Sequence, residues 1–146
     1  LLIGIIFDRF IHTIVFLSCY CTLRQFTGGY HAKNYTECTL TFAAIYLITI
    51  FVANNIDIVS YKYLSIVILI ISMFIIYKLA PLEHRNKPLS NKEKHIYRIT
   101  AMKITSFITM IFIASIVRKI FVEYSIYSLF AVCWIGILLI VGYYNN

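Results

Sequence analysis

The chain is poor in residues that interrupt regular structure and poor in charge. It contains only 2 Pro and 5 Gly among 146 residues, which excludes collagen-like chains and disordered chains rich in Pro and Gly. Charged residues make up 13% and hydrophobic residues 61%, whereas soluble domains average about 25% and 45–50%. A soluble fold of this size still exposes roughly a third of its unfolded surface. So much apolar area therefore excludes a soluble globular enzyme and makes lipid the expected solvent.

Acidic residues are scarce as well, at 6 against 13 Lys and Arg, for a net charge of +7. The basic residues gather between apolar runs, which is typical of cytoplasmic loops in membrane proteins. Because no basic face with interleaved aromatic residues is present, we do not expect nucleic-acid binding. The four cysteines lack the spacing of a secreted disulfide framework. The chain begins without Met, inside an apolar run, so we expect an N-terminal part of the protein to precede it.

Apolar runs set the expected topology, because a helix needs about 20 largely apolar residues to span a bilayer. The runs show no alternating period of two, and lipid excludes open sheet edges, so helices are predicted. We therefore expect an all-α, polytopic integral membrane protein with about five to six transmembrane helices and a single membrane domain over residues 1–146. The five predicted spans are Phe10–Leu23, Leu40–Ala53, Tyr63–Ala80, Met102–Val117 and Phe121–Tyr143. The first could extend back to Leu1 across Asp8 and Arg9.

The breaks between the runs predict orientation. The most basic break covers residues 81–100, and the positive-inside rule places it in the cytoplasm. Two spans separate it from the break at 24–39, so parity places that loop on the same side. The break at Asn54–Lys62 then lies outside. Arg118, Lys119 and Glu123 would lie outside too, and the two basic residues there go mildly against the rule.

The break at 24–39 holds most of the groups capable of chemistry. Polar and ionisable residues at membrane depth are expensive and usually functional. Cys38 stands where the second span should begin, with Asn34 or Thr36 as the N-cap. A helix N-terminus and a nearby imidazole both favour the reactive thiolate. His31 could supply the imidazole, although seven residues of regular helix would separate the two by about 10.5 Å. The chain must bend between them, and Gly28–Gly29 favours such a bend.

Simpler interpretations apply to several of these residues. Cys19, Cys21 and Cys133 are expected to be small packing groups, and His12 an interhelical hydrogen-bonding or interfacial group. A metal site would use Cys19, Cys21, His31 and Cys38, but their spacing does not fit zinc; no metal and no cofactor is predicted. Arg24 could extend to the headgroups. The basic 81–100 segment could be a solvated loop facing anionic lipid.

Two segments together resemble a known family. Arg24-x3-Gly28-Gly29-x-His31-Ala32-x5-Cys38 and Ala80-Pro-x-Glu83-x2-Asn86-Lys87-Pro88-Leu89 are similar to the accessory gene regulator B (AgrB) family, membrane cysteine endopeptidases of Gram-positive bacteria. The resemblance extends from about the first span to the C-terminus. It implies a multi-pass protein of the bacterial cell membrane, with the active-site loop at the cytoplasmic face.

The resemblance also implies a reaction and a partner. Members cleave the C-terminal part from a quorum-sensing precursor of the AgrD type. Cys38 would attack the scissile carbonyl to form a thioester, with His31 as general base and then general acid. Attack on the thioester by a side chain of the precursor would give a thiolactone or lactone ring. Substrate-binding or loop-bracing roles then fall to Arg24, Gly28, Gly29, Asn34, Glu37, Arg85, Lys87 and Lys92; the last three would attract an acidic part of the precursor.

Two alternatives remain at this stage. A small peptide transporter or exporter component would need no nucleophile, so replacing Cys38 would be silent. A purely structural membrane subunit would tolerate loss of His31 too, but the polar loop argues against it. The residues do not fix the oligomeric state; a homodimer is compatible with them. Family members usually begin with a longer N-terminal region, so this chain could lack part of what activity requires.

Overall fold

The computed structural model describes residues 2–28, 35–55, 62–82 and 90–145. This part of the chain is helical: α1 covers Leu2–Ile6, α2 Phe10–Thr27, α3 Tyr35–Asn55, α4 Lys62–Leu79, α5 Asn91–Arg118 and α6 Val122–Asn145. Among the described residues, no strand is present. The all-α prediction is therefore confirmed.

Three helices are long and apolar enough to cross a membrane: α4, α5 and α6. The described part of the protein is therefore polytopic, as expected. The apolar part of α3 is shorter, at Thr39–Asn55, and α2 carries His12 and Arg24 within its 18 residues. Whether α2 and α3 also span the membrane stays a prediction.

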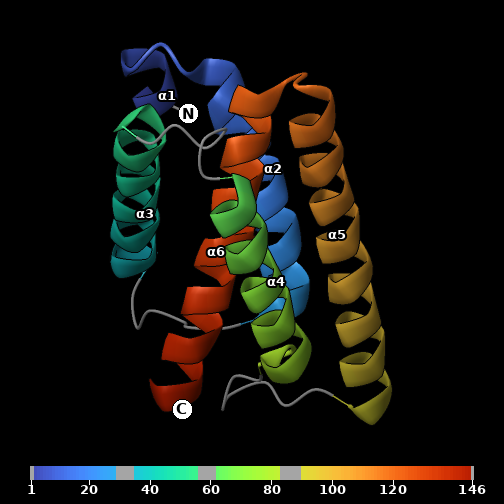
Figure 1. The fold of residues 1–146 in the computed structure, drawn as a ribbon. Helices are drawn as coiled ribbons and strands as arrows, with labels where there is room; N and C mark the ends of the chain where they lie inside the picture. The colour runs from blue at the N-terminus through green and yellow to red at the C-terminus, as the bar shows by residue number, and fades with distance from the viewer. Residues whose placement is uncertain (1, 29–34, 56–61, 83–89, 146) are drawn as a thin grey trace.

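Helix α6 is the centre of the bundle. It contacts α2, α3, α4 and α5, and it is the most buried of the three candidate spans. Helices α2, α4 and α5 lie alongside it, while α3 stands to one side (Figure 1). Most outward residues of α4 are apolar, among them Leu64, Ile71 and Phe74. An apolar outer surface is what lipid around the bundle requires.

Both predicted loops join the same end of the bundle. Figure 1 shows α2 and α4 ending, and α3 and α5 beginning, at the end where α6 also terminates. We call this the motif end, because the helix ends that flank the two motif segments lie there. The helix ends that flank the breaks at 24–39 and 81–100 thus lie together; the side of the membrane on which they lie stays a prediction.

The two largest differences from the predicted boundaries lie at the start of α5 and near the N-terminus. The break assigned to residues 81–100 is too long, because α5 begins at Asn91 rather than near Met102. Ser90 accepts a hydrogen bond from the Glu93 N–H while the Glu93 carboxylate accepts one from the Ser90 N–H. Such a capping box satisfies two N–H groups that the helix start leaves free. The polar residues 91–101 are thus helical despite their composition.

The second difference lies near the N-terminus. The predicted extension of the first span across Asp8 and Arg9 is wrong, since α1 ends at Ile6 and α2 begins at Phe10. Asp8 has φ +54°, a left-handed conformation that a continuous helix does not contain. Pro81 cannot continue a helix, and α4 ends just before it, at Leu79.

Candidate active site

The end of α2 is closed by contacts between Arg24 and Gly28. The Gly28 N–H donates to the Arg24 carbonyl at 3.2 Å, and the Arg24 guanidinium donates to the Gly28 carbonyl. Between them, Thr27 is fully buried and donates to the Leu23 carbonyl at 2.9 Å. One arginine therefore fixes the backbone on both sides of Gly28, a contact of the loop-bracing kind.

Gly28 also meets the chain that follows α4. The Leu82 N–H donates to the Thr27 carbonyl at 2.9 Å, and Gly28 and Leu82 pair as an isolated parallel bridge. Gly28 has φ +66°, and a Cβ built on it would stand 2.3 Å from the Leu82 carbonyl oxygen. A side chain fits neither that backbone conformation nor that space. The two segments that carry the family resemblance thus touch, and the contact requires glycine.

The first turns of α5 contact the ends of α2 and α4. Arg98 donates to the Ala80 carbonyl at 3.2 Å, and a longer contact of 3.5 Å reaches the Lys78 carbonyl. On the side of α2, the Phe26 ring meets the Tyr97 ring edge-on, with centroids 5.8 Å apart. Carbonyls at a helix C-terminus lack intrahelical partners and attract cations. Arg98 therefore caps α4 and fixes α5 beside it.

Cys38 is the fourth residue of α3 and so lies in its first turn. Of Cys38 and Glu37, the structure describes the main chain only. The placement agrees with the expected helix N-terminus, and Tyr35 as the first helical residue puts Thr36 inside the helix rather than at its N-cap. Lys92 is exposed in the first turn of α5. Five further predicted residues lie outside the described ones: Gly29, His31, Asn34, Arg85 and Lys87.

Helix α3, which carries Cys38, is held to the bundle along one side. Near its start, the Phe42 ring lies 5.4 Å from the Tyr20 ring of α2. Farther along, the Trp134 indole of α6 donates to the Thr49 hydroxyl at 3.0 Å, and Thr49 is fully buried. Interhelical hydrogen bonds of this kind stabilise helix pairs in lipid. The register of α3 against α6 is therefore fixed about three turns from Cys38.

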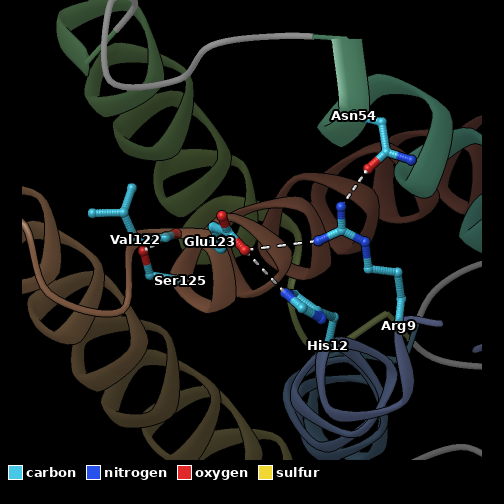
Figure 2. A network of polar contacts seen from close by, with 6 residues as sticks. All are labelled: Arg9, His12, Asn54, Val122, Glu123 and Ser125. Atoms are coloured by element: carbon cyan, nitrogen blue, oxygen red, sulfur yellow. Dashed lines mark hydrogen bonds and ion pairs between the residues drawn. The ribbon is translucent and has the colours of Figure 1, made fainter.

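A second polar cluster lies at the opposite end of the bundle, and the sequence analysis missed most of it. Figure 2 shows Arg9 pointing between Asn54 of α3 and Glu123 of α6. The Arg9 guanidinium lies 3.2 Å from the Asn54 Oδ1 and 3.7 Å from the Glu123 Oε2. The members are 45 and 114 residues apart in the chain, so no local spacing could have pointed to them.

His12 is the one member of this cluster that the sequence analysis singled out, as an interhelical or interfacial group. Its Nε2 lies 3.7 Å from the Glu123 carboxylate of α6 (Figure 2). Its ring stacks on Tyr124, with centroids 4.6 Å apart. His12 is thus an interhelical contact, but not through the hydrogen bond that was expected of it. Its Nε2 is buried and makes no hydrogen bond, so ring stacking is its main contribution.

The remaining cysteines agree with packing roles in two of three cases. Cys19 and Cys133 are half-buried against the hydrophobic core. Cys21 is exposed on α2 and does not pack there, because its position on the helix turns it outward to lipid. Within the described ranges, no cluster of three or more His, Cys, Asp or Glu could hold a metal ion.

These observations define a class: a polytopic, all-helical membrane protein with two motif segments joined at one end of its bundle. The chain belongs to the accessory gene regulator B (AgrB) family, whose sequence model matches residues 1–141. AgrB-like protein 2 of Clostridium perfringens strain 13 is 30% identical over 125 residues, which cover 80% of this chain and 58% of the relative. An AgrB-like protein of strain SM101 is 30% identical over 124 residues, covering 80% and 57%.

The chain thus spans somewhat more than half the length of these two relatives. No solved structure shows significant similarity to it.

Proposed function

We propose that this chain is the catalytic membrane domain of a cysteine endopeptidase that processes an AgrD-type quorum-sensing precursor. The observation that most supports it is the main-chain contact between Gly28 and Leu82. It joins the segment that leads to His31 and Cys38 to the segment that begins the second motif. A transporter component has no evident need for a glycine-dependent contact between precisely these two segments, whereas an active site built from both does.

Cys38 is the proposed nucleophile. Its place in the first turn of α3 sets it near free N–H groups and the positive end of the helix dipole, both of which favour a thiolate. His31 takes the thiol proton as Cys38 attacks the scissile carbonyl, and returns it to the leaving amine as the peptide bond breaks. The products are a thioester on Cys38 and the free C-terminal part of the precursor. Main-chain N–H groups near Cys38 are the proposed donors to the oxyanion.

Ring closure follows by acyl exchange. A cysteine thiolate within the bound precursor attacks the thioester carbonyl, a new carbon–sulfur bond forms and the Cys38 thiolate leaves. The product is a thiolactone, or a lactone where a serine hydroxyl attacks instead. No oxidant or cofactor is consumed. Arg24 serves the loop by holding Gly28, rather than by binding a substrate carboxylate.

The motif end is the proposed cytoplasmic end. Its described helix ends carry five basic residues and two acidic residues, Glu37 and Glu93; the basic ones are Arg24, Lys78, Lys92, Lys94 and Arg98. The positive-inside rule favours the cytoplasm for such an end. A newly made precursor is available on that side, and Arg85, Lys87 and Lys92 would attract its acidic part. Replacing these three with Glu should slow cleavage of an acidic precursor and spare a neutral one.

Purified protein in liposomes, given a candidate precursor, tests the assignment by mass spectrometry. We expect wild type to release the C-terminal fragment and both Cys38→Ala and His31→Ala to release none. Cys21→Ala is the matched control, because Cys21 is exposed on α2 and outside the motif; it should cleave as wild type does. Cleavage by all three variants would refute the dyad, while transport of uncut peptide by Cys38→Ala would favour the exporter.

A further inference from the structure

Two apolar grooves flank the last turns of α5. One, of about 470 Å³, lies between α2, α5 and α6, and the other, of about 500 Å³, lies between α5 and Met73 of α4. Both volumes fall within the range of small-molecule sites, about 300–1,000 Å³. The grooves share two lining residues, Ala114 and Arg118. These are four apart and so lie on one face of α5, where they form the ridge between the grooves.

The lining of the first groove presents carbon rather than polar atoms. Its walls include Val15 of α2 and Ile111 of α5. Three serines also line it, but their hydroxyls donate to nearby main-chain carbonyls and so are already satisfied: Ser115 to Ile120, Ser125 to Val122 and Ser128 to Ser125. The second groove is lined by apolar residues such as Met110 and Ile113. Both grooves therefore suit hydrocarbon chains.

Positive charge stands at the head of the ridge. Arg118 is exposed, and among the described residues it forms no ion pair. Lys119 follows it and is exposed as well. The main-chain N–H groups of Lys119 and Ile120 bond the Ile116 and Ser115 carbonyls in the last turn of α5, so neither side chain is needed for those bonds. The nearby Glu123 carboxylate faces Arg9 and His12 instead (Figure 2).

We propose that this ridge binds one anionic diacyl phospholipid, with the phosphate at Arg118 and Lys119 and one acyl chain in each groove. Two apolar grooves that meet at Arg118, with Lys119 next in the chain, match the two tails and single phosphate of such a lipid. The site lies at the end opposite the motif, where the positive-inside rule predicts few cations. A bound anionic headgroup accounts for Arg118 and Lys119 at that face. The proposal is independent of peptidase activity.

Native mass spectrometry of the full chain in neutral detergent tests the headgroup. We expect one dioleoyl phosphatidylglycerol to bind more tightly than dioleoyl phosphatidylcholine. Arg118→Gln should weaken phosphatidylglycerol binding about fivefold, the contribution of one basic residue near an anionic headgroup. Lys62→Gln is the matched control: this lysine is exposed at the start of α4, at the same end of the bundle and outside both grooves. It should leave binding unchanged.

Two further measurements test the grooves. Ala114→Phe places a ring on the ridge, where it obstructs one of the two grooves and should weaken binding of the diacyl lipid, whereas Val67→Phe, on the exposed face of α4, should not. A single-chain lysophosphatidylglycerol should bind more weakly than the diacyl lipid, because it fills only one groove. Equal binding of the two headgroups, unchanged binding by Arg118→Gln, or occupation of the ridge by a second copy of the chain would each overturn the proposal.

Discussion

The two ends of the bundle are held by different kinds of contact. At the motif end the contacts reach main-chain atoms, as between the Leu82 N–H and the Thr27 carbonyl. At the opposite end side chains meet side chains, as between Arg9 and Glu123, whose carboxylate is largely exposed. A main-chain contact restricts which residue can stand there, whereas exposed ion pairs contribute about 0–1 kcal/mol. Substitutions at the motif end should therefore be the more damaging.

The largest effect is expected for Gly28→Ala. The new methyl would meet the Leu82 carbonyl, and alanine rarely adopts φ +66°. Strain of this kind costs about 1–3 kcal/mol, and the clash adds to it, so we expect a loss of more than about 2 kcal/mol in unfolding free energy. Unfolding in mixed detergent micelles measures it. Processing of the precursor should also slow, because the substitution separates the two motif segments.

Gly136→Ala is the control for this substitution. Its added Cβ would lie 3.6 Å from the nearest atoms of Ser72, an ordinary contact distance, in a regular helix. It should cost little and leave processing intact. If both variants lost equal stability, the requirement for glycine at the Gly28–Leu82 contact would be refuted.

The difference between the two ends of the bundle also explains which parts of the structure the sequence could predict. Five apolar runs predicted the five long helices, because lipid demands continuous apolar surface. The motif end was recognisable because its polar residues stand close together between two such runs. The start of α5 was not predicted, although Ser90-x-x-Glu93 is a capping-box signal, because the residues that follow it are too polar to resemble a membrane span.

The opposite end could not be predicted in the same way. Arg9, Asn54 and Glu123 come from three separate helix ends, and each alone resembles an ordinary charged or polar residue beside a span. Only the packing of α2, α3 and α6 brings them together. The contact of Gly28 with Leu82 was equally hidden, because no sequence spacing relates two loops that pair through the main chain.

A smaller effect is expected for Arg98→Gln. The substitution removes the cation that bonds the Ala80 carbonyl at 3.2 Å, and a partly exposed hydrogen bond contributes about 1 kcal/mol. Unfolding in mixed micelles should show that loss. Lys92→Gln, one residue past the start of α5, should change stability by less than about 0.5 kcal/mol. Equal effects would mean that Arg98 does not connect α4 to α5.

Trp134→Phe should cost about 0.6 kcal/mol, the average for interhelical hydrogen bonds in a membrane protein. The substitution removes the hydrogen bond from the indole of α6 to the Thr49 hydroxyl of α3. A double-mutant cycle with Thr49→Val should recover most of that energy as coupling. Because α3 carries Cys38, we also expect slower processing than the stability loss alone explains. Additive effects in the cycle would show that this bond does not fix the register of α3.

His12→Phe should have the smallest effect, near zero or slightly stabilising. The phenyl ring can keep the stacking on Tyr124, and the substitution removes a buried Nε2 that has no hydrogen bond. Replacing an unsatisfied buried polar group by an apolar one of similar shape is often favourable. His12→Ala loses the ring and should be clearly destabilising. Comparing the two variants distinguishes the contribution of ring packing from that of the imidazole charge. If His12→Phe instead cost as much as Arg98→Gln, the pair with Glu123 at 3.7 Å would have to contribute as a charged contact. The motif end would then be held through main-chain atoms and the opposite end through side chains, but the contacts at both ends would contribute similar stability.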